Sequence, residues 1–289
     1  MSDTDSAVLI TGAAGGIGSA AVRLLAERGH RVFAGVRRPA PALDGLPRVE
    51  QLPFDVTDPD AVAAAADAVS AAVGGLRAVV NNAGLIVQGP QELLPPADLR
   101  LQFEVNTFAP VYVTQAFLPL LRRGHGRVIN VSAPTANTPI PFMGPISASK
   151  AALASLSSAL RTELAAWDIP VVLVEPDSTD TPIWAKTDAS TRRSLDAADQ
   201  ARAALYAPHL EAIAAATAAQ KLGPVEPAAK AILAAVEART PKRRYFVGRA
   251  RALSTLSKLP DGLRERLIAQ TFGLSGLARA MPAGSAGRS

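Results

Sequence analysis

Short apolar runs recur along this chain, and most are followed by a longer segment with the apolar spacing of a helix. Predicted strands lie at residues 7–12, 31–38, 49–58, 76–84, 126–132 and 170–176, with a short seventh at 243–248. The longest helical patterns lie at 98–121 and 146–168. Strands that alternate with helices favour a parallel sheet with helices on both faces. We therefore predict an α/β fold, a doubly wound parallel sheet of about seven strands.

Two segments depart from this alternation. After the sixth predicted strand, residues 177–222 begin with a polar stretch and continue into an alanine-rich helical pattern. Ligands of parallel sheets bind at the carboxyl ends of the strands, so an insertion there predicts a substrate lid. Residues 251–289 alternate apolar and basic positions at helical spacing. We expect one domain at 1–250, lid included, and a basic helical C-terminal extension at 251–289.

Positive charge is concentrated in the C-terminal part of the chain. Residues 241–289 contain ten Lys/Arg and two Asp/Glu, although the whole chain carries a net charge of only +5. Three interpretations remain open for such a segment: packing over the substrate entrance, peripheral contact with a membrane surface, or a subunit contact. Nucleic-acid binding is not expected, because no nucleic-acid motif accompanies the basic residues.

Composition excludes several classes of chemistry. The chain has no cysteine, which rules out disulfides and cysteine nucleophiles. Its histidines, His30, His125 and His209, are far apart in the sequence, so no metal site is expected. The start of the chain has no basic segment followed by an apolar core, and no apolar run approaches the length of a membrane span. We expect a cytoplasmic protein without a transmembrane segment.

A glycine-rich turn connects the first predicted strand to the first helix. Gly12, Gly16 and Gly18 lie in the sequence TGAAGGIG at 11–18. Glycines let the backbone approach a pyrophosphate, and the helix N-terminus offers free N–H groups and a positive dipole end. Arg37 ends the second predicted strand without an acidic neighbour, which favours a ribose 2′-phosphate. We predict a dinucleotide cofactor, with NADP favoured over NAD.

Together these motifs resemble the short-chain dehydrogenase/reductase family over about residues 6–250. The motifs that carry the resemblance are TGAAGGIG, Asp55 after the third strand, NNAG at 81–84, Asn106, Ser132, Lys150 and the Pro176–Thr181 segment. The resemblance implies a Rossmann fold, an oxidoreductase, and a homodimer or homotetramer formed through the helices at 98–121 and 146–168. The extended C-terminal part is similar to the branch that acts on steroids, retinoids and other apolar alcohols or ketones.

The resemblance also assigns roles to individual residues. It implies cofactor contacts for Thr11, Gly12, Gly16, Ile17, Gly18, Arg37, Asp55, Val56, Asn81, Ala83, Gly84, Lys150, Pro176 and Thr181. Ser132 would hydrogen-bond the substrate oxygen, and Asn106 would hold a water of the proton relay. Lys150 would bind the nicotinamide ribose and lower the pKa of a neighbouring acid.

Two positions depart from the family pattern. Ile146 stands four residues before Lys150, where the family has a tyrosine that acts as general acid and base. Isoleucine has no proton to donate, and the loss of one general acid lowers a rate by about 10²- to 10⁴-fold. Asp177 follows Pro176, where the family has glycine. At the edge that faces the substrate, Asp177 is our first candidate for a replacement acid, ahead of Ser147, Tyr112, Tyr206 and His209.

Three functions follow from this combination. The first is an NADP-dependent oxidoreductase on an apolar carbonyl or alcohol, with a non-standard proton donor. The second is a non-redox enzyme of secondary metabolism on the same scaffold, such as a cyclase, dehydratase or isomerase. The third is a catalytically inactive dinucleotide-binding partner protein. In both enzymatic interpretations the catalytic candidates are Ser132, Lys150, Asn106 and Asp177, and the substrate is an apolar small molecule.

Overall fold

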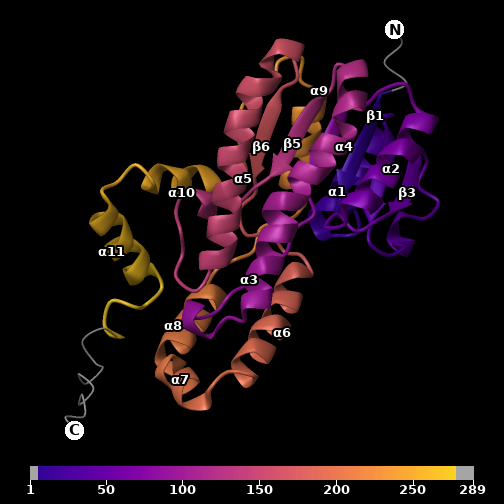
Figure 1. Cartoon of the computed structure of the whole chain (residues 1–289). Coiled ribbons are helices and arrows are strands. Elements are labelled where there is room, and N and C mark those ends of the chain that lie inside the picture. The colour runs from indigo at the N-terminus through magenta and orange to yellow at the C-terminus, as the bar shows by residue number, and fades with distance from the viewer. Residues whose placement is uncertain (1–5, 278–289) are drawn as a thin grey trace.

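The chain folds around one seven-stranded sheet in which all paired strands are parallel (Figure 1). The computed structural model describes residues 6–277. The strand order is β3-β2-β1-β4-β5-β6-β7. The strands are β1 (Ala7–Thr11), β2 (Arg31–Val36), β3 (Val49–Pro53), β4 (Ala78–Asn81), β5 (Arg127–Val131), β6 (Val171–Glu175) and β7 (Arg244–Phe246). The predicted doubly wound fold is confirmed.

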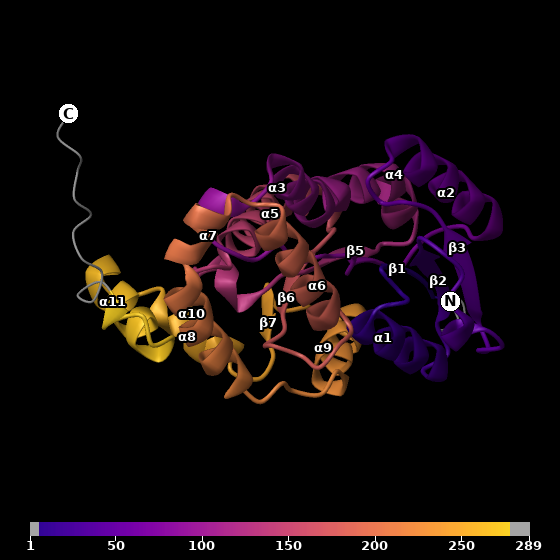
Figure 2. The same cartoon turned by 90° about the horizontal axis from the view of Figure 1, so that it is seen from below.

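Helices cover both faces of the sheet (Figure 2). One face packs against α1 (Gly16–Glu27) and α9 (Glu226–Glu237). The other packs against α2 (Pro59–Ala72), α4 (Ala109–Arg123) and α5 (Gly144–Glu163). The strand order reverses direction between β1 and β4, and in sheets of this kind the crevice at that point binds ligands.

Both faces of the sheet are buried, which explains why the strands are continuous apolar runs. Successive side chains of a strand point to opposite faces, so Leu9 belongs to the α2–α4 side and Ile10 to the α1–α9 side. Both are fully buried, because both faces of the sheet are covered. The α2–α4 side is filled by larger rings such as Phe33 and Phe117. The α1–α9 side contains mostly Ala, Val, Ile and Leu.

The segment predicted as one helix at 98–121 is divided. It consists of α3 (Pro96–Phe103), a π-helical turn at Glu104–Phe108 and then α4. A π turn inserts a residue without ending the helix, so the apolar spacing continues across it. The turn carries Asn106, which therefore lies at an irregularity in the backbone.

The segment predicted as a lid forms three helices after β6: α6 (Ile183–Asp196), α7 (Gln200–Leu205) and α8 (Ala207–Ala218). The polar stretch expected before the helical pattern is itself largely helical, since α6 begins at Ile183. Its hydroxyl groups bond α3 and the loop before it: Ser194 donates to the Asp98 carboxylate and Thr191 to the Gln88 carbonyl. These polar contacts explain why hydropathy alone did not indicate a packed helix.

The C-terminal extension contributes α10 (Ala250–Leu256) and α11 (Asp261–Thr271), and α11 projects from the body of the molecule (Figure 1). Thr138, in the loop after β5, donates a hydrogen bond to the Leu253 carbonyl at 2.8 Å.

Short 3₁₀ helices lie at Pro41–Leu43, Gln91–Leu93, Pro134–Ala136 and Leu164–Trp167. Within residues 6–277, no helix has both the length and the apolarity to cross a bilayer. The last twelve residues of the predicted basic extension lie outside the described part.

Candidate active site

The turn after β1 requires glycine at two positions. Gly12 has a φ of +64°, and a Cβ there would lie 2.7 Å from the Ala83 Cα. A Cβ on Gly18 would lie 2.3 Å from the Gly12 carbonyl oxygen. Real Cβ atoms do not approach other atoms this closely, so the turn packs against the segment after β4 only with glycine.

A hydrogen-bond network holds this turn to the end of β4. The Thr11 hydroxyl accepts from the backbone N–H groups of Asn82 and Ala83, each at 3.1 Å. The Asn82 side-chain amide donates back to the carbonyls of Thr11 and Gly12, at 3.0 and 3.2 Å. Asn82 is thus a site residue that our sequence analysis did not select, although it lies in the NNAG motif.

The N-terminus of α1 has free donors. Its N-cap is Gly15, which has no side chain to cap the helix, and the first turn contains no acidic residue. The first N–H groups of the helix therefore have no partner within the helix, and they suit an anion such as a pyrophosphate. Thr181 packs over this turn, because a Cβ on Gly16 would come within 2.5 Å of the Thr181 methyl carbon. Ile17, between the two glycines, packs against the core instead.

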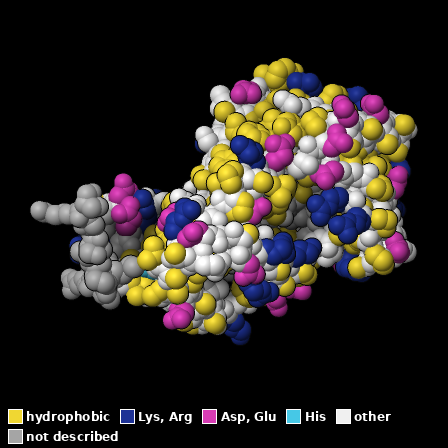
Figure 3. Space-filling view, turned by 60° about the horizontal axis from the view of Figure 1, so that its bottom comes forward, with side chains coloured by type: hydrophobic (Ala, Val, Ile, Leu, Met, Phe, Trp, Pro, Cys, Tyr) yellow, Lys and Arg dark blue, Asp and Glu magenta, His cyan; other side chains and the backbone are white. Residues whose placement is uncertain are grey.

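Positive charge lies next to the carboxyl end of β2. Arg37 and Arg38 follow this strand and are exposed. Asp55, after β3, has its pKa lowered mainly by the Thr57 backbone N–H, with smaller contributions from the Thr57 hydroxyl and the Arg37 charge. Figure 3 shows Lys and Arg side chains beside a hollow in one face of the molecule. The residues around the glycine turn therefore fit a dinucleotide that carries an additional phosphate.

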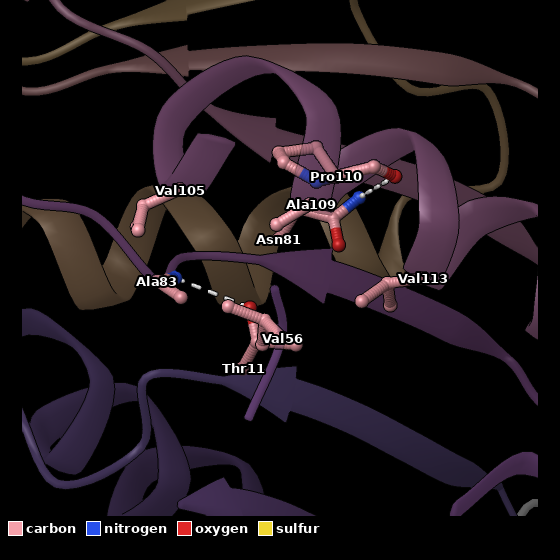
Figure 4. Close-up of a pocket in the computed structure, with 8 residues that line it drawn as sticks. All are labelled: Thr11, Val56, Asn81, Ala83, Val105, Ala109, Pro110 and Val113. Carbon is pink, nitrogen blue, oxygen red and sulfur yellow. Dashed lines mark hydrogen bonds between the residues drawn. The ribbon is translucent and has the colours of Figure 1, made fainter. Parts of the chain in front are cut away.

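A narrow crevice, too tight to hold a water molecule, lies between the ends of β1 and β4 and the start of α4 (Figure 4). It is lined by Thr11, Val56, Asn81, Ala83, Val105, Ala109, Pro110 and Val113. Asn81 is buried, and its side-chain amide donates to Asn130, Thr114 and the Pro110 carbonyl. The Asn81 side chain therefore ties β4 to β5 and α4, and its predicted cofactor contact remains a prediction.

Ser132 and Lys150 come together at the end of β5. The Lys150 ammonium donates to the Val131 carbonyl at 2.7 Å, directly before Ser132 in the chain. Burial lowers the pKa of Lys150 to about 8. The Ser132 hydroxyl is buried and has no hydrogen-bond partner among the described residues. A buried hydroxyl without a partner is costly, so this atom is well placed to bind a ligand.

The Asn106 side chain lies close to Gly84 and is held by Leu85. Its side-chain oxygen accepts from the Leu85 N–H at 3.0 Å and its amide donates to the Leu85 carbonyl at 2.9 Å. A Cβ built on Gly84 would lie 3.4 Å from the Asn106 side-chain oxygen and 3.8 Å from the Lys150 Nζ. Gln102, which the sequence did not indicate, makes a parallel pair of bonds to the Val87 N–H and the Leu85 carbonyl.

Comparison with known proteins identifies this arrangement. A family model for short chain dehydrogenase matches residues 6–192. The chain belongs to the short chain dehydrogenase family. It is 34% identical over 276 residues to an NADPH-dependent 3-dehydrocapnine reductase of Ornithobacterium rhinotracheale, covering 90% of this chain and 95% of the relative. Human 11-beta-hydroxysteroid dehydrogenase type 2 is 32% identical over 304 residues, covering 97% and 74%.

Solved structures of short chain dehydrogenases share the fold. One from Burkholderia cenocepacia, in complex with NADP, superposes with a TM-score of 0.72 at 28% identity, covering 94% of this chain and 99% of that one. Another from Streptomyces avermitilis gives 0.69 at 28% identity, covering 97% and 100%.

Ile146 occupies the position where we expect the family's tyrosine. It lies in the first turn of α5, four residues before Lys150, so both side chains share one face of the helix. Ile146 is 6% exposed. Its side chain adds an apolar wall next to the lysine and supplies no hydrogen-bonding group.

Asp177 has a different environment from the one we expected. Its carboxylate accepts from the Arg249 guanidinium at 2.7 Å and from the N–H groups of Arg249 and Ser178. The side chain thus faces the C-terminal extension rather than a free substrate position. Its catalytic role remains a prediction. In these contacts the carboxylate oxygens act as hydrogen-bond acceptors. Pro176, before it, is buried at the end of β6.

The other candidate proton donors also contact neighbouring residues. The Ser147 hydroxyl donates to the Met143 carbonyl at 2.8 Å, within its own helix. Partial desolvation, followed by the Glu104 carboxylate, raises the pKa of Tyr112. The remaining two are lid residues: Tyr206 donates to Glu92 at 2.8 Å, and His209 packs with Tyr206 and Phe142.

Proposed function

We propose that this protein is an NADP-dependent oxidoreductase that acts on an apolar carbonyl or alcohol and uses a proton donor other than tyrosine. The observation that carries the proposal is the buried, unpartnered Ser132 hydroxyl beside Lys150, on the same sheet edge as the free amides of α1. A site that binds an oxygen next to a dinucleotide turn suits oxidation or reduction of that oxygen's carbon.

The cofactor part of the proposal rests on charge. The exposed Arg37 and Arg38 supply cations where a ribose 2′-phosphate would lie. One relative is named as NADPH-dependent, and one structural neighbour was solved in complex with NADP. We infer the same preference for NADP here.

The residues of the site would have separate roles. The glycine turn and the N-terminus of α1 would hold the pyrophosphate, and Lys150 the nicotinamide ribose. When bound in its reduced form, the nicotinamide supplies a hydride. Ser132 would donate a hydrogen bond to the substrate oxygen and so fix its position. Ile146 would exclude water from the space that a phenol occupies in other members of the family.

The substrate part of the proposal rests on the apolar surroundings of the site. Ile146, and Val87 after β4, are buried apolar side chains of this region. Trp184 begins the lid, held by its indole N–H to the Thr179 carbonyl at 2.9 Å. Several relatives are named as steroid dehydrogenases, including estradiol 17-beta-dehydrogenase 2 of Mus musculus at 34% identity. We infer a substrate with a large apolar body.

Calorimetry with NADPH and NADH tests this proposal. We expect NADPH to bind more tightly than NADH, and Arg37→Ala to remove most of that preference while NADH binding stays within about threefold. A charge-assisted phosphate contact is worth about 1.5–3 kcal/mol, or roughly 10- to 150-fold in affinity. The matched control is Glu27→Ala, an exposed residue at the end of α1.

The outcomes separate the proposal from the non-redox alternative. Binding of NADPH together with reduction of steroid or long-chain ketones supports the proposal. Product formation without oxidation of the nicotinamide would move the protein to the non-redox class. Absence of NADPH binding by the native chain would overturn the proposal.

A further inference from the structure

We propose that Lys150 is itself the proton donor and acceptor of this site, in place of the phenol that position 146 lacks. This inference rests on the proposed oxidoreductase function and adds a residue role to it. The lysine then does more than bind a ribose and assist a neighbouring acid.

The geometry leaves Lys150 free to donate. Within the described residues its ammonium makes one hydrogen bond, to the Val131 carbonyl at 2.7 Å, and an ammonium has three N–H groups. The next residue is Ser132, whose buried hydroxyl has no partner in the described part of the chain. With the Val131 carbonyl and one ribose hydroxyl bound, the ammonium keeps one N–H group for an oxygen held by Ser132.

Gly84 borders the ammonium on the other side. A Cβ built on Gly84 would lie 3.8 Å from Nζ, an ordinary contact distance, so a larger side chain there would press against the nitrogen. Asn106 borders the same glycine, since its side-chain oxygen would be 3.4 Å from that Cβ. The Asn106 amide is fixed on both sides by Leu85.

The electrostatic surroundings suit proton exchange near neutral pH. The groups shown next to Nζ are neutral: the Val131 carbonyl on β5 accepts its hydrogen bond, and Gly84 after β4 borders it. Desolvation is therefore the cause of the lowered pKa, which falls to about 8. A general acid works best when its pKa lies near the operating pH. With a tyrosine at 146, the lysine would have a hydroxyl beside it; with isoleucine it stays dry.

The proton balance is simple. In reduction, a bound reduced nicotinamide would supply the hydride of the new C–H bond, while Ser132 and Lys150 hold the oxygen that receives the carbonyl π pair. The Lys150 N–H bond breaks as the O–H bond of the alcohol forms, which leaves a neutral amine. The amine then takes a proton from water. Oxidation of the alcohol runs through the reverse transfer, with the neutral amine as base.

Two variants of Lys150 and one control test the inference. Lys150→Met removes the amine, whereas Lys150→Arg keeps a cation for the ribose but cannot release its proton in this pH range. Lys230→Met makes the same substitution on the exposed surface of α9. Each protein is measured for NADPH affinity, for kcat in ketone reduction from pH 6 to 10, and by NMR of ¹³C-labelled lysine.

We expect the lysine signal that disappears in Lys150→Met to titrate near pH 8 in the cofactor-free native protein. Because the ammonium is the acid, kcat for ketone reduction should fall above that pH in the native protein. Lys150→Met and Lys150→Arg should both lower kcat by about 10²-fold or more, and this pH dependence should disappear. Lys150→Arg should still bind NADPH within about tenfold, and Lys230→Met should behave as the native protein.

Failure of the inference differs from failure of the proposed function. If Lys150→Arg retains most of the native kcat with the same pH dependence, Lys150 only positions the ribose and the inference is wrong. The same holds if the native chain binds NADPH but reduces none of the ketones, since its lysine is intact. If none of the proteins binds NADPH, the oxidoreductase function itself is wrong. A loss of kcat in Ser132→Ala alone, with Lys150→Met unaffected, would assign the proton to the serine.

Discussion

At the scale of single residues, Ile146 gives the lysine one turn away an apolar neighbour without a hydrogen-bonding group. Lys150 is buried, no acid is paired with it in the described structure, and its pKa is lowered by desolvation. A buried charge without a counter-ion lowers the stability of a fold. The site therefore keeps Lys150 at a cost in folding free energy, which is typical of a residue retained for function.

This cost predicts that Lys150→Met stabilises the protein at pH 7. The lowered pKa means that the unfolded state binds more protons than the folded state between about pH 8 and the ordinary lysine value of 10.5. Native stability therefore rises with pH through that window. Below it, the difference corresponds to about 3 kcal/mol at about 1.4 kcal/mol per pH unit. Urea unfolding at pH 7 and pH 10 checks this: the advantage of the variant should shrink at the higher pH.

A second residue-scale prediction concerns Ile146→Tyr. The phenol would stand on the same face of α5 as Lys150, where the ammonium would lower its pKa. We expect NADPH-dependent ketone reduction by this variant to be faster than by Ile146→Phe, because the phenol supplies a second general acid beside Lys150. Ile146→Phe is the matched control, because it adds the ring without the hydroxyl. Equal rates for both variants would contradict the expectation.

The sequence predicted which residues meet at the strand ends, because the backbone of a parallel sheet determines their position. Gly12, Ser132 and Lys150 come together as expected, because parallel strands place their carboxyl ends at one edge. Side-chain direction was not predictable. Asn81 turns into the core towards Asn130, and Asp177 turns towards Arg249, a residue more than seventy positions away. Long-range partners of this kind leave no trace in local sequence.

At the scale of elements, the π turn between α3 and α4 determines where Asn106 lies. The extra residue bulges the backbone, and the Asn106 side chain bonds both polar groups of Leu85 across the gap. The sequence predicted a single helix at 98–121, because the apolar spacing shifts by only one residue there. The strands β3 and β7 are likewise shorter than predicted. Apolar residues continue into the loops that follow them, so the sequence pattern extended both strands too far.

The contact between Asp177 and Arg249 attaches the C-terminal extension to the loop after β6. We predict that Asp177→Asn weakens the docking of α10, because the amide loses the charge that pairs with the guanidinium. The pair is partly exposed, so the expected effect is at most about 1 kcal/mol. Hydrogen exchange should then be a few-fold faster in α10, with α1 unchanged. Asp67→Asn, on the exposed face of α2, is the control and should leave both helices as in the native protein.

At the scale of the whole molecule, large apolar side chains are exposed on the helices that we expect to form a subunit contact. Phe108 at the start of α4 is 45% exposed and Leu156 on α5 is 43% exposed. We predict a homodimer or homotetramer that uses these helices, and a shift to monomer in Phe108→Arg/Leu156→Arg. Light scattering after gel filtration measures this. Leu205→Arg, on the lid, should leave the assembly intact, and a monomeric native chain would disprove the prediction.

The packing of α1 against α9 on one face of the sheet also affects how the protein is made. These helices are separated by about two hundred residues, so the side of α1 that meets α9 has no cover until α9 leaves the ribosome. During that time an uncovered helix and three early strands are exposed to chaperones and to other nascent chains. We expect force on the nascent chain, measured with arrest peptides, to appear only after residue 237 has emerged, and truncated chains that end before α9 to aggregate.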